Sequence, residues 1–355
     1  MAKERIHSMP ETKGTFVVKG IASGVEKQNF YTEKKTRTGK DFRAVNFGVS
    51  YNENQAVYMS LNGMPRDEVY FSKKIGEKTE TKKVNWANRN KPDPDGYRII
   101  GDVLLGLAKT VDEKGKEVND KKTMVGFDAC KYIAENMVDD SSVYIRGKMD
   151  YSSFTNKNGD VSRSTKFIPT QISLCQDVDF AKEGYEPENN FTQTIVFVGI
   201  DQEKDSNDKP TGRFVVESKI VNYNSIESAA FIIEDSKLAK MFKTNLKPYW
   251  GITVHGKISV SNAVEAVENE DCWGEENKMN RVSAPTKREL IITGATPSTM
   301  DKESYSEKAI SEAIRKMNAA KEAEQNFTGN VASVNDSDWG TSSEIDDDLN
   351  DSEPW

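Results

Sequence analysis

Three short segments of the first half of the chain recur, in the same order, in the second half. Residues 15–21 (TFVVKGI) match residues 194–200 (TIVFVGI), Thr38-Gly39-Lys40 matches Thr211-Gly212-Arg213, and residues 144–148 (YIRGK) match residues 253–257 (TVHGK). Because the order is shared, we interpret the chain as a duplicated β-unit. The offsets are unequal, with 199 − 20 = 179 and 212 − 39 = 173 but 256 − 147 = 109. The first unit must therefore carry an insertion of about 65 residues before its Gly-Lys strand.

Residues 143–175 predict two long strands joined by the turn Asn158-Gly159-Asp160. At the start of this hairpin apolar and polar side chains alternate, so one face can pack while the other carries rings and charges. We expect the outward side chains to include Lys148, Tyr151, Phe154, Lys157, Arg163 and Lys166. Rings that stack on bases and cations that follow phosphates are what sequence-tolerant binding of single strands requires. A solvated hairpin whose charges only keep it soluble is the alternative.

Charge is segregated along the 355 residues, whose formal net charge is −8. Residues 1–170 hold 30 Lys and Arg against 23 Asp and Glu (+7), residues 171–334 hold 19 against 26 (−7), and residues 335–355 hold none against eight (−8). This asymmetry indicates a polyanionic partner for the first half. The last stretch is also poor in apolar residues, which predicts disorder.

Several classes of protein are disfavoured. The three cysteines, Cys130, Cys175 and Cys272, and the two histidines lack the spacing of a zinc or redox motif, so we expect no metal and no cofactor. Acidic residues lie on predicted loops and the tail, and no P-loop or His-Glu pair occurs, which argues against a nuclease or primase. The sequence lacks an apolar run of about 20 residues and an apolar signal core, so we expect a soluble, intracellular protein.

Periodicity predicts strand, strand, strand, helix, strand, strand in both units, which is the order of an OB-fold, a small Greek-key barrel that binds oligonucleotides. The predicted fold class is mainly β, with two OB-fold domains, the first carrying a large insertion, plus a C-terminal helix and a disordered acidic tail. The boundaries are 1–12 (disordered), 13–176 (first domain, main single-strand binder, with the insertion at about 60–122), 177–190 (linker), 191–298 (second domain), 299–325 (helix) and 326–355 (tail).

The insertion and the second unit differ in charge. Residues 73–91 are basic and contain Trp86, which either stacks on a base or anchors the loop to the domain. The hairpin at 261–284 is acidic and would repel phosphates, so we expect the second domain to serve assembly rather than to span further nucleotides. The amphipathic helix packs either on the second domain or on another subunit.

Parts of the chain resemble the single-stranded DNA-binding proteins of bacteria and their phages. Residues 42–54 (FRAVNFGVSYNEN) are similar to the core strand of that family, and the Gly147-Lys148 strand with its hairpin resembles its DNA-wrapping hairpin. The segment 346–355 resembles the family's acidic tip, which ends in Pro and an aromatic residue and recruits replication and repair proteins. Trp355 stands where that family normally has Phe.

The resemblance covers about residues 13–60 and 125–175, loosely 191–297, and the tip. The common cellular form has one OB-fold per chain and works as a tetramer. The duplicated domain and the insertion depart from that form, which favours a phage protein acting as a dimer or a monomer. We expect the acidic tail to compete weakly with DNA for the basic groove.

Residues and resemblance together predict a non-enzymatic protein that coats and protects single-stranded DNA, without sequence preference, during phage DNA replication, recombination and repair. Its place would be the cytoplasm or nucleoid of the bacterial host. A scaffold that binds no DNA and a mediator that anneals strands are the alternatives.

The candidate residues fall into three groups. The stacking candidates are Phe30, Tyr31, Trp86, Tyr151 and Phe154. The phosphate-contacting candidates are Lys34, Lys35, Arg37, Lys40, Arg43, Lys82, Lys83, Arg146, Lys148, Lys157, Arg163 and Lys166. The partner-binding candidates are Asp346, Asp347, Asp348, Asp351, Glu353, Pro354 and Trp355.

Overall fold

The first half of the chain closes a ring of five strands. The computed structural model describes residues 5–155, 161–205, 207–261 and 287–327. The ring consists of β1 (Gly14–Ser23), β3 (Asp41–Ser50), β4 (Ala56–Gly63), β10 (Ser142–Thr155) and β11 (Val161–Leu174). Strand β1 pairs antiparallel with β3 and with β10, β3 pairs with β4, and β10 pairs with β11. Strands β4 and β11 run parallel and close the ring where Met59 meets Phe167.

A second ring with the same connections follows. Its elements are β12 (Asn189–Lys204), β13 (Pro210–Val221), β14 (Ile226–Ile233), α2 (Ser236–Asn245), β15 (Gly251–Ser261) and β16 (Lys287–Asp301). Strands β12, β13, β14, β16 and β15 pair in that order, β15 returns to β12, and the parallel contact is Ile232 with Ile291. In the first ring the corresponding helix is α1 (Gly126–Asn136), so both helices lie between the third and fourth strands of their rings.

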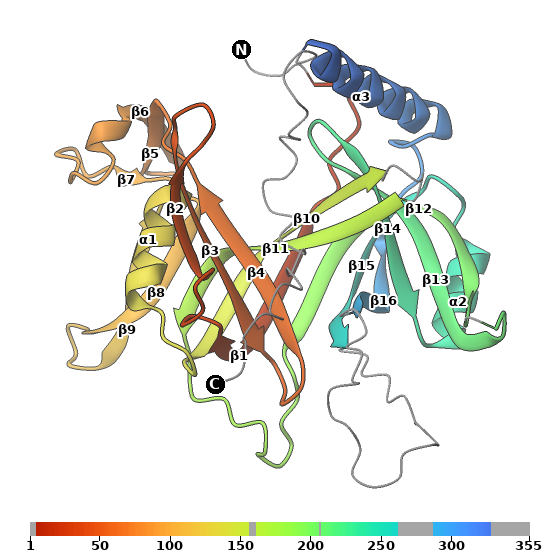
Figure 1. Ribbon diagram of the computed structural model, residues 1–355, viewed down its shortest axis with the longest axis horizontal. Coiled ribbons are helices and arrows are strands. Elements are labelled where there is room, and N and C mark those ends of the chain that lie inside the picture. The colour runs from red at the N-terminus through yellow and green to blue at the C-terminus, as the bar shows by residue number, and fades with distance from the viewer. Residues whose placement is uncertain (1–4, 156–160, 206, 262–286, 328–355) are drawn as a thin grey trace, which may run out of the picture.

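The insertion lies between β4 and α1 and forms two small units (Figure 1). Strands β5 (Glu68–Ile75), β6 (Lys78–Asn85) and β7 (Arg98–Ile99) make a separate three-stranded sheet, and η1 (Trp86–Asn88) follows β6. Strands β8 (Val103–Val111) and β9 (Glu117–Met124) form a hairpin, and β8 runs parallel to the end of β11. A short strand, β2 (Tyr31–Lys35), pairs with β3.

The structure corrects the alignment of the two units. Gly147 pairs with Phe16, and Gly256 pairs with Phe191, so these first strands are offset by 191 − 16 = 175 rather than 179. The turn in which Thr36 N donates to Lys40 O likewise corresponds to the turn at 205–209, an offset of 169 rather than 173. The third sequence match, whose offset is 109, agrees with the strand pairing, because Gly147 and Gly256 each lie opposite a phenylalanine of the first strand of their ring. A slip of four residues keeps every side chain on its own face of a strand, so alternation alone could not reveal it.

The two rings share one core because their first strands pair with each other. Strand β1 lies antiparallel to β12, from Gly14 opposite Gln193 to Val18 opposite Asn189, and this pairing joins both rings into one sheet. The hairpin of β10 and β11 continues towards the second ring, where Tyr151 packs 6.4 Å from Phe231 between ring centroids (Figure 1).

The second hairpin makes the reciprocal contact. Val260, which corresponds to Tyr151 because 260 − 151 = 109, donates its N–H to the hydroxyl of Tyr51 in the first ring at 3.2 Å. The fourth strand of each ring, β10 or β15, therefore contacts the other ring.

The N-terminal segment and α3 (Glu307–Phe327) close the far side of the second ring (Figure 1). Ile310 of α3 and Met9 share a buried cluster with Val221 of β13. The Thr12 hydroxyl accepts from Val221 N at 2.8 Å. Met9 and Thr12 are therefore buried, and the expectation of disorder is wrong for these two residues, because Met9 supplies apolar surface that the cluster buries. The helix packs on its own second ring.

Some expectations fall outside the part of the chain that the structure describes. The turn Asn158-Gly159-Asp160, most of the acidic hairpin at 261–284 and nearly all of the tail from 326 are among them. Of the helices that are described, none is long and apolar enough to cross a membrane.

We predict that Gly147→Ala destabilises the protein and Gly199→Ala does not. A Cβ on Gly147 would stand 2.2 Å from Ile168 O and 2.4 Å from the Phe16 ring, whereas one on Gly199 would meet no atom within 4 Å. Overpacking of this kind costs about 1–3 kcal/mol, against about 0.5 kcal/mol or less for an open site. Urea unfolding of both variants checks this, and equal losses of stability would show that the close approach of Phe16 is not what requires glycine.

Candidate nucleic-acid interface

One open surface of the first ring lies on the outside of β3 and β4. Alternation along β4 turns Val57, Met59 and Leu61 into the core, so Tyr58, Ser60 and Asn62 face outward. Tyr58 is 49% exposed. Its ring lies against Gly48 of β3, where a Cβ would come within 3.3 Å of it. The glycine therefore leaves room for a flat, accessible ring on this face.

Cations border this ring on two sides. The parallel contact of Met59 with Phe167 places Lys166 of β11 next to the outward side chains of β4. From the second ring, the Arg288 guanidinium carbon lies 5.7 Å from the centroid of Tyr58. We call this surface the β3–β4 face; its members are Asn46, Tyr58, Ser60, Asn62, Lys166 and Arg288.

The predicted basic connection before β3 is exposed at its turn. Lys35 lies 3.1 Å from Asp41, and the Lys34 ammonium lies 6.0 Å from the Phe42 ring centroid. Arg37 and Lys40 are exposed on the turn itself, where Gly39 adopts a φ of 78°. These four predicted phosphate contacts remain accessible beside the β3–β4 face.

Two other predicted residues hold α1 against β3 instead. Arg43 bonds to Glu33 at 2.8 Å, and its guanidinium lies 3.9 Å from the Phe127 ring centroid. The Tyr31 hydroxyl donates to Glu33 at 2.6 Å, and burial together with this hydrogen bond raises the pKa of Tyr31 to about 12. Arg43 and Tyr31 therefore form a packed cluster, which corrects their prediction as open contacts for DNA.

Phe30 and Tyr151 are also corrected, since both are 5% exposed and cannot stack on a base. Tyr151 has the same parity as Val143 and Ile145, so the alternation of β10 turns it inward with them, and its burial raises the pKa of its hydroxyl. The sequence contained this signal. The side chain of Phe154 and all of Lys157 lie outside the described residues.

In the insertion, Trp86 acts as an anchor. Its ring meets Phe127 of α1 edge-on at 6.0 Å, and Arg89 covers it at 4.1 Å while also bonding to Asp128 at 2.7 Å. The anchor interpretation of Trp86 therefore holds over the stacking one.

The two predicted lysines of β6 are paired with acids. Lys82 binds Asp93 and Asp95, the latter at 3.4 Å, and Lys83 lies 2.9 Å from Glu68. Phosphate would have to displace these carboxylates from both lysines.

The remaining predicted cations lie on the long hairpin. Arg146 and Lys148 are exposed on the outer side of β10. Arg163 instead bonds to Glu217 of the second ring at 3.2 Å, so it joins the two rings. The hairpin thus has one open basic side and an end that docks within the chain.

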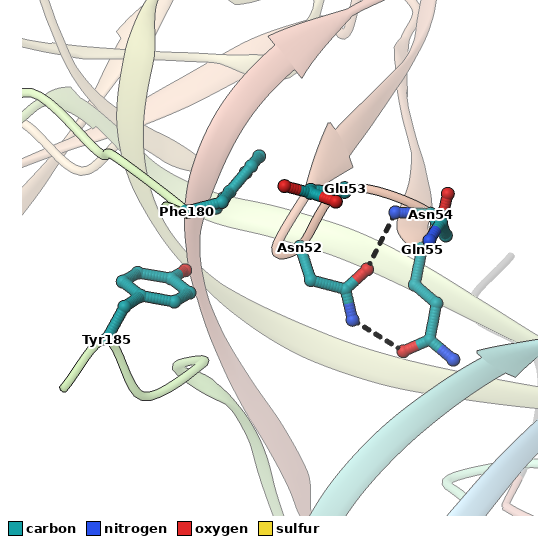
Figure 2. Close-up of a pocket in the computed structure, with 6 residues that line it drawn as sticks. All are labelled: Asn52, Glu53, Asn54, Gln55, Phe180 and Tyr185. Atoms are coloured by element: carbon teal, nitrogen blue, oxygen red, sulfur yellow. Dashed lines mark hydrogen bonds between the residues drawn. The ribbon is translucent and has the colours of Figure 1, made fainter. Parts of the chain in front are cut away.

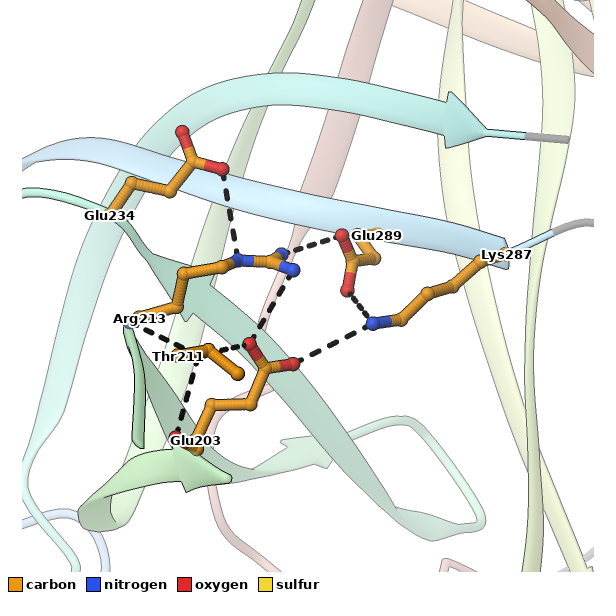
Figure 3. A network of polar contacts seen from close by, with 6 residues as sticks. All are labelled: Glu203, Thr211, Arg213, Glu234, Lys287 and Glu289. Atoms are coloured by element: carbon orange, nitrogen blue, oxygen red, sulfur yellow. Dashed lines mark hydrogen bonds and ion pairs between the residues drawn. The ribbon is translucent and has the colours of Figure 1, made fainter. Parts of the chain in front are cut away.

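The second ring carries a closed ion-pair network where the first has its open face (Figure 3). Arg213 lies 2.6 Å from Glu289, 3.4 Å from Glu203 and 3.7 Å from Glu234. Lys287 bonds to Glu289 at 2.8 Å and lies 3.5 Å from Glu203. Two cations thus meet three carboxylates, and the network as a whole is acidic.

Matched registers show how far the two faces have diverged. Ala230 occupies the position of Tyr58 and Glu234 that of Asn62 (230 − 58 = 234 − 62 = 172). Glu289 occupies the position of Lys166 (289 − 166 = 123, as for Ile292 and Pro169). At matched positions, the second ring has neither an exposed aromatic side chain nor a lysine.

A shallow pocket lies beside the first ring, between the β3–β4 turn and the linker (Figure 2). Asn52 donates to Gln55 at 2.9 Å and accepts from Asn54 N at 3.0 Å. Opposite them, Phe180 and Tyr185 pack edge-on at 5.5 Å, and the Tyr185 hydroxyl donates to Tyr51 O. These contacts fasten the linker to the first ring, and the pocket carries no cation.

Sequence reasoning missed Tyr58, Asn62 and Arg288. The alternation of residues 56–63 (AVYMSLNG) could have placed Tyr58 outside, whereas Arg288 reaches the face only through the packing of the two rings. Within the described ranges, no group of three or more His, Cys, Asp or Glu side chains is arranged to hold a metal ion.

Comparison with known proteins gives one broad match. A family model described as YorF matches residues 13–329. No curated protein matches the sequence.

Two solved structures of the single-stranded DNA binding protein from Thermus aquaticus align with the chain. The wild-type structure has a TM-score of 0.35 and 7% identity, over 80% of this chain and 91% of that one. A deletion mutant has a TM-score of 0.36 and 8% identity, over 81% and 94%. This likeness is too low to support an inference.

We predict that Glu289→Gln weakens the fold at neutral pH and matters less in acid. Burial alone favours the neutral acid, but hydrogen bonds and charge from Lys287 and Arg213 outweigh it and lower the pKa of Glu289 below 4.5. A lowered pKa stabilises the fold above the ordinary value, and this stabilisation is lost as the pH falls through the lowered one. Urea unfolding at pH 7 and at successively lower pH measures it. Glu234→Gln, at the exposed edge of the network, is the control and should cost less stability at neutral pH, because the Glu234 side chain is 57% exposed against 11% for Glu289.

Proposed function

We propose that this chain, which belongs to the YorF family, is a sequence-independent single-stranded DNA-binding protein whose two rings are OB-folds. In the OB-fold, five strands close a barrel, and the face of strands 2 and 3 with the loop between strands 1 and 2 binds oligonucleotides. In the first ring these are β3, β4 and the basic connection that contains β2.

The observation that carries the proposal is the contrast between matched faces. The first ring offers the accessible Tyr58 with Lys166 and Arg288 beside it. The cations of the 36–40 turn lie on the basic connection that leads into β3. An exposed aromatic side chain can stack on any unpaired base, and cations can follow any phosphate backbone. This chemistry therefore selects single strands without reading their sequence. The second ring has alanine and glutamates at the same positions, and its carboxylates would repel phosphates.

We assign the second ring to assembly within the chain rather than to the main DNA contact. Its first strand pairs with β1, and Val260 of β15 donates to the Tyr51 hydroxyl of the first ring. It also supplies Arg288 to the β3–β4 face. The β3–β4 face of the first ring is thus built partly by the second ring.

The wider role that we propose follows from the resemblance. The protein would coat and protect single-stranded DNA during phage DNA replication, recombination and repair, in the cytoplasm or nucleoid of the bacterial host. Its acidic segment with Pro354 and Trp355 would recruit partner proteins, and it would occupy the basic surface until DNA displaces it.

Tyr58→Ala should weaken binding of dT oligomers while the protein stays folded. Loss of one stacked base costs about 1–3 kcal/mol, or roughly five- to 150-fold in affinity. Fluorescence anisotropy with labelled dT oligomers and a matching duplex measures this, and circular dichroism checks the fold. Tyr223→Ala is the matched control, because Tyr223 is similarly exposed (51%) but lies in the second ring. Equal losses in both variants, or binding of duplex as tightly as single strands, would contradict the proposed face.

Removal of residues 335–355 should tighten dT binding at low salt, because it removes eight acidic residues and no basic one. The effect should fade as added salt screens the charges. The same titrations measure it. As a control, P354A/W355A keeps the acids and should bind dT as the intact chain does. An unchanged affinity after deletion would reject competition between tail and DNA.

A further inference from the structure

A second open surface crosses the boundary between the rings. The pairing of β1 with β12 places six neighbouring antiparallel strands in the order β11, β10, β1, β12, β15, β16. One side of these strands is the shared core. On the other side, Thr15, Arg146, Thr192 and Lys257 are all exposed, and the Lys257 ammonium donates to Pro187 O of the linker at 3.0 Å. We call this side the central face.

The pairing registers give the layout of the central face. One row runs Lys148, Thr15, Thr192, His255, and the next runs Arg146, Val17, Asn190, Lys257. In both rows the two middle side chains, on β1 and β12, are short and uncharged, and the outer ones are long and basic or titratable. Neighbouring strands lie about 4.8 Å apart, so the outer side chains of a row stand about 14 Å from each other at the backbone.

Further charges lie at the margins of this strip. Lys13, which directly precedes β1, and Lys19 of β1 occupy opposite ends of it. Of the described acidic residues, Asp150 lies beyond Lys148 and pairs with Lys166, and Glu188 lies beside Lys19. Two further linker acids, Glu183 and Glu186, line a pocket with Lys19. The strip thus carries five cations, Lys13, Lys19, Arg146, Lys148 and Lys257, with its carboxylates at the margins. A strip with cations along both borders fits a polyanion whose backbone lies over the short side chains in the middle.

The strip continues into the β3–β4 face. Both surfaces meet at β11, where Lys166 neighbours β4 on one side and Asp150 of β10 on the other. A second copy of the chain is a poorer occupant, because twofold stacking would bring the five cations of one copy against those of the other.

We infer that the central face is a second contact surface for single-stranded nucleic acid, over which a strand bound at the β3–β4 face continues from the first ring onto the second. This inference rests on the proposed function and extends it. Contacts of these cations with phosphates add salt-dependent affinity only to strands long enough to pass β11. The acidic network of the second ring meets the central face only at its β16 margin, where Glu289 lies opposite Ser259.

The test compares dT oligomers of graded length on three full-length proteins. The central-face variant is R146Q/K148Q/K257Q. Its control is K237Q/K240Q/K243Q, which makes the same charge change at exposed lysines of α2. The third protein is unaltered. Affinity is measured over a range of salt concentrations, and mass by light scattering.

With long oligomers, the central-face variant should reduce the slope of log K against log[salt] by about 2, since each lost phosphate contact on a single strand removes about 0.7. With the shortest oligomers that bind, the three proteins should have the same slope of log K against log[salt].

An unchanged slope with long oligomers, or an equal loss in the α2 control, would overturn the inference and leave the proposed function standing. A smaller mass for the central-face variant alone would assign this face to a second copy and also overturn it. If the unaltered protein bound no oligomer of any length, both the inference and the proposed function would fail.

Discussion

The antiparallel pairing of β1 with β12 is the interaction on which the rest of the structure depends. It runs from Gly14 to Val18 along β1 and satisfies backbone groups that would otherwise lie at an open edge of each ring. Because the pair is antiparallel, it relates the two rings by an approximate twofold axis. The hairpins that leave them therefore point in opposite directions, each onto the other ring. The single core, the Tyr151 contact and the Val260 contact all follow from this one pairing.

Duplication within one chain frees the two faces to differ. In a symmetric dimer, a change at Tyr58 would appear on both rings. Here Tyr58, Asn62 and Lys166 have become Ala230, Glu234 and Glu289 in the second ring without any effect on the first. Arg213 and Lys287 pair with these glutamates and with Glu203, which leaves the network with one excess negative charge. One ring can specialise in the open, basic face, while the other supplies structure and the distant Arg288.

Much of the architecture could be predicted from residue patterns, and the errors have definite causes. Alternation and turn residues predicted the order of strands and helix in each ring, whereas α3 begins at Glu307, eight residues after the expected start at 299. The repeat was detected but aligned four residues out, because an even slip preserves the alternation. Tyr151 was expected to face outward because it is aromatic, although the alternation of β10 places it on the inward side with Val143 and Ile145. Tyr31 and Arg43 lie in a basic segment whose charges predict solvent. The Arg43 guanidinium nevertheless lies over the Phe127 ring of α1, and Glu33 accepts hydrogen bonds from both residues.

The sequence by itself determined the local structure: which segments form strands, which residues of each strand share a face, and that the first half is basic. These follow from steric preferences and a two-residue period that act over a few neighbours. Only the tertiary structure decided which faces stay open. The exposure of Tyr58, the burial of Tyr151, the arrival of Arg288 and the rows of the central face depend on registers between strands up to 240 residues apart, such as Thr15 with His255 across β12 (255 − 15 = 240). Those registers are fixed by packing the whole core at once, which no local pattern encodes.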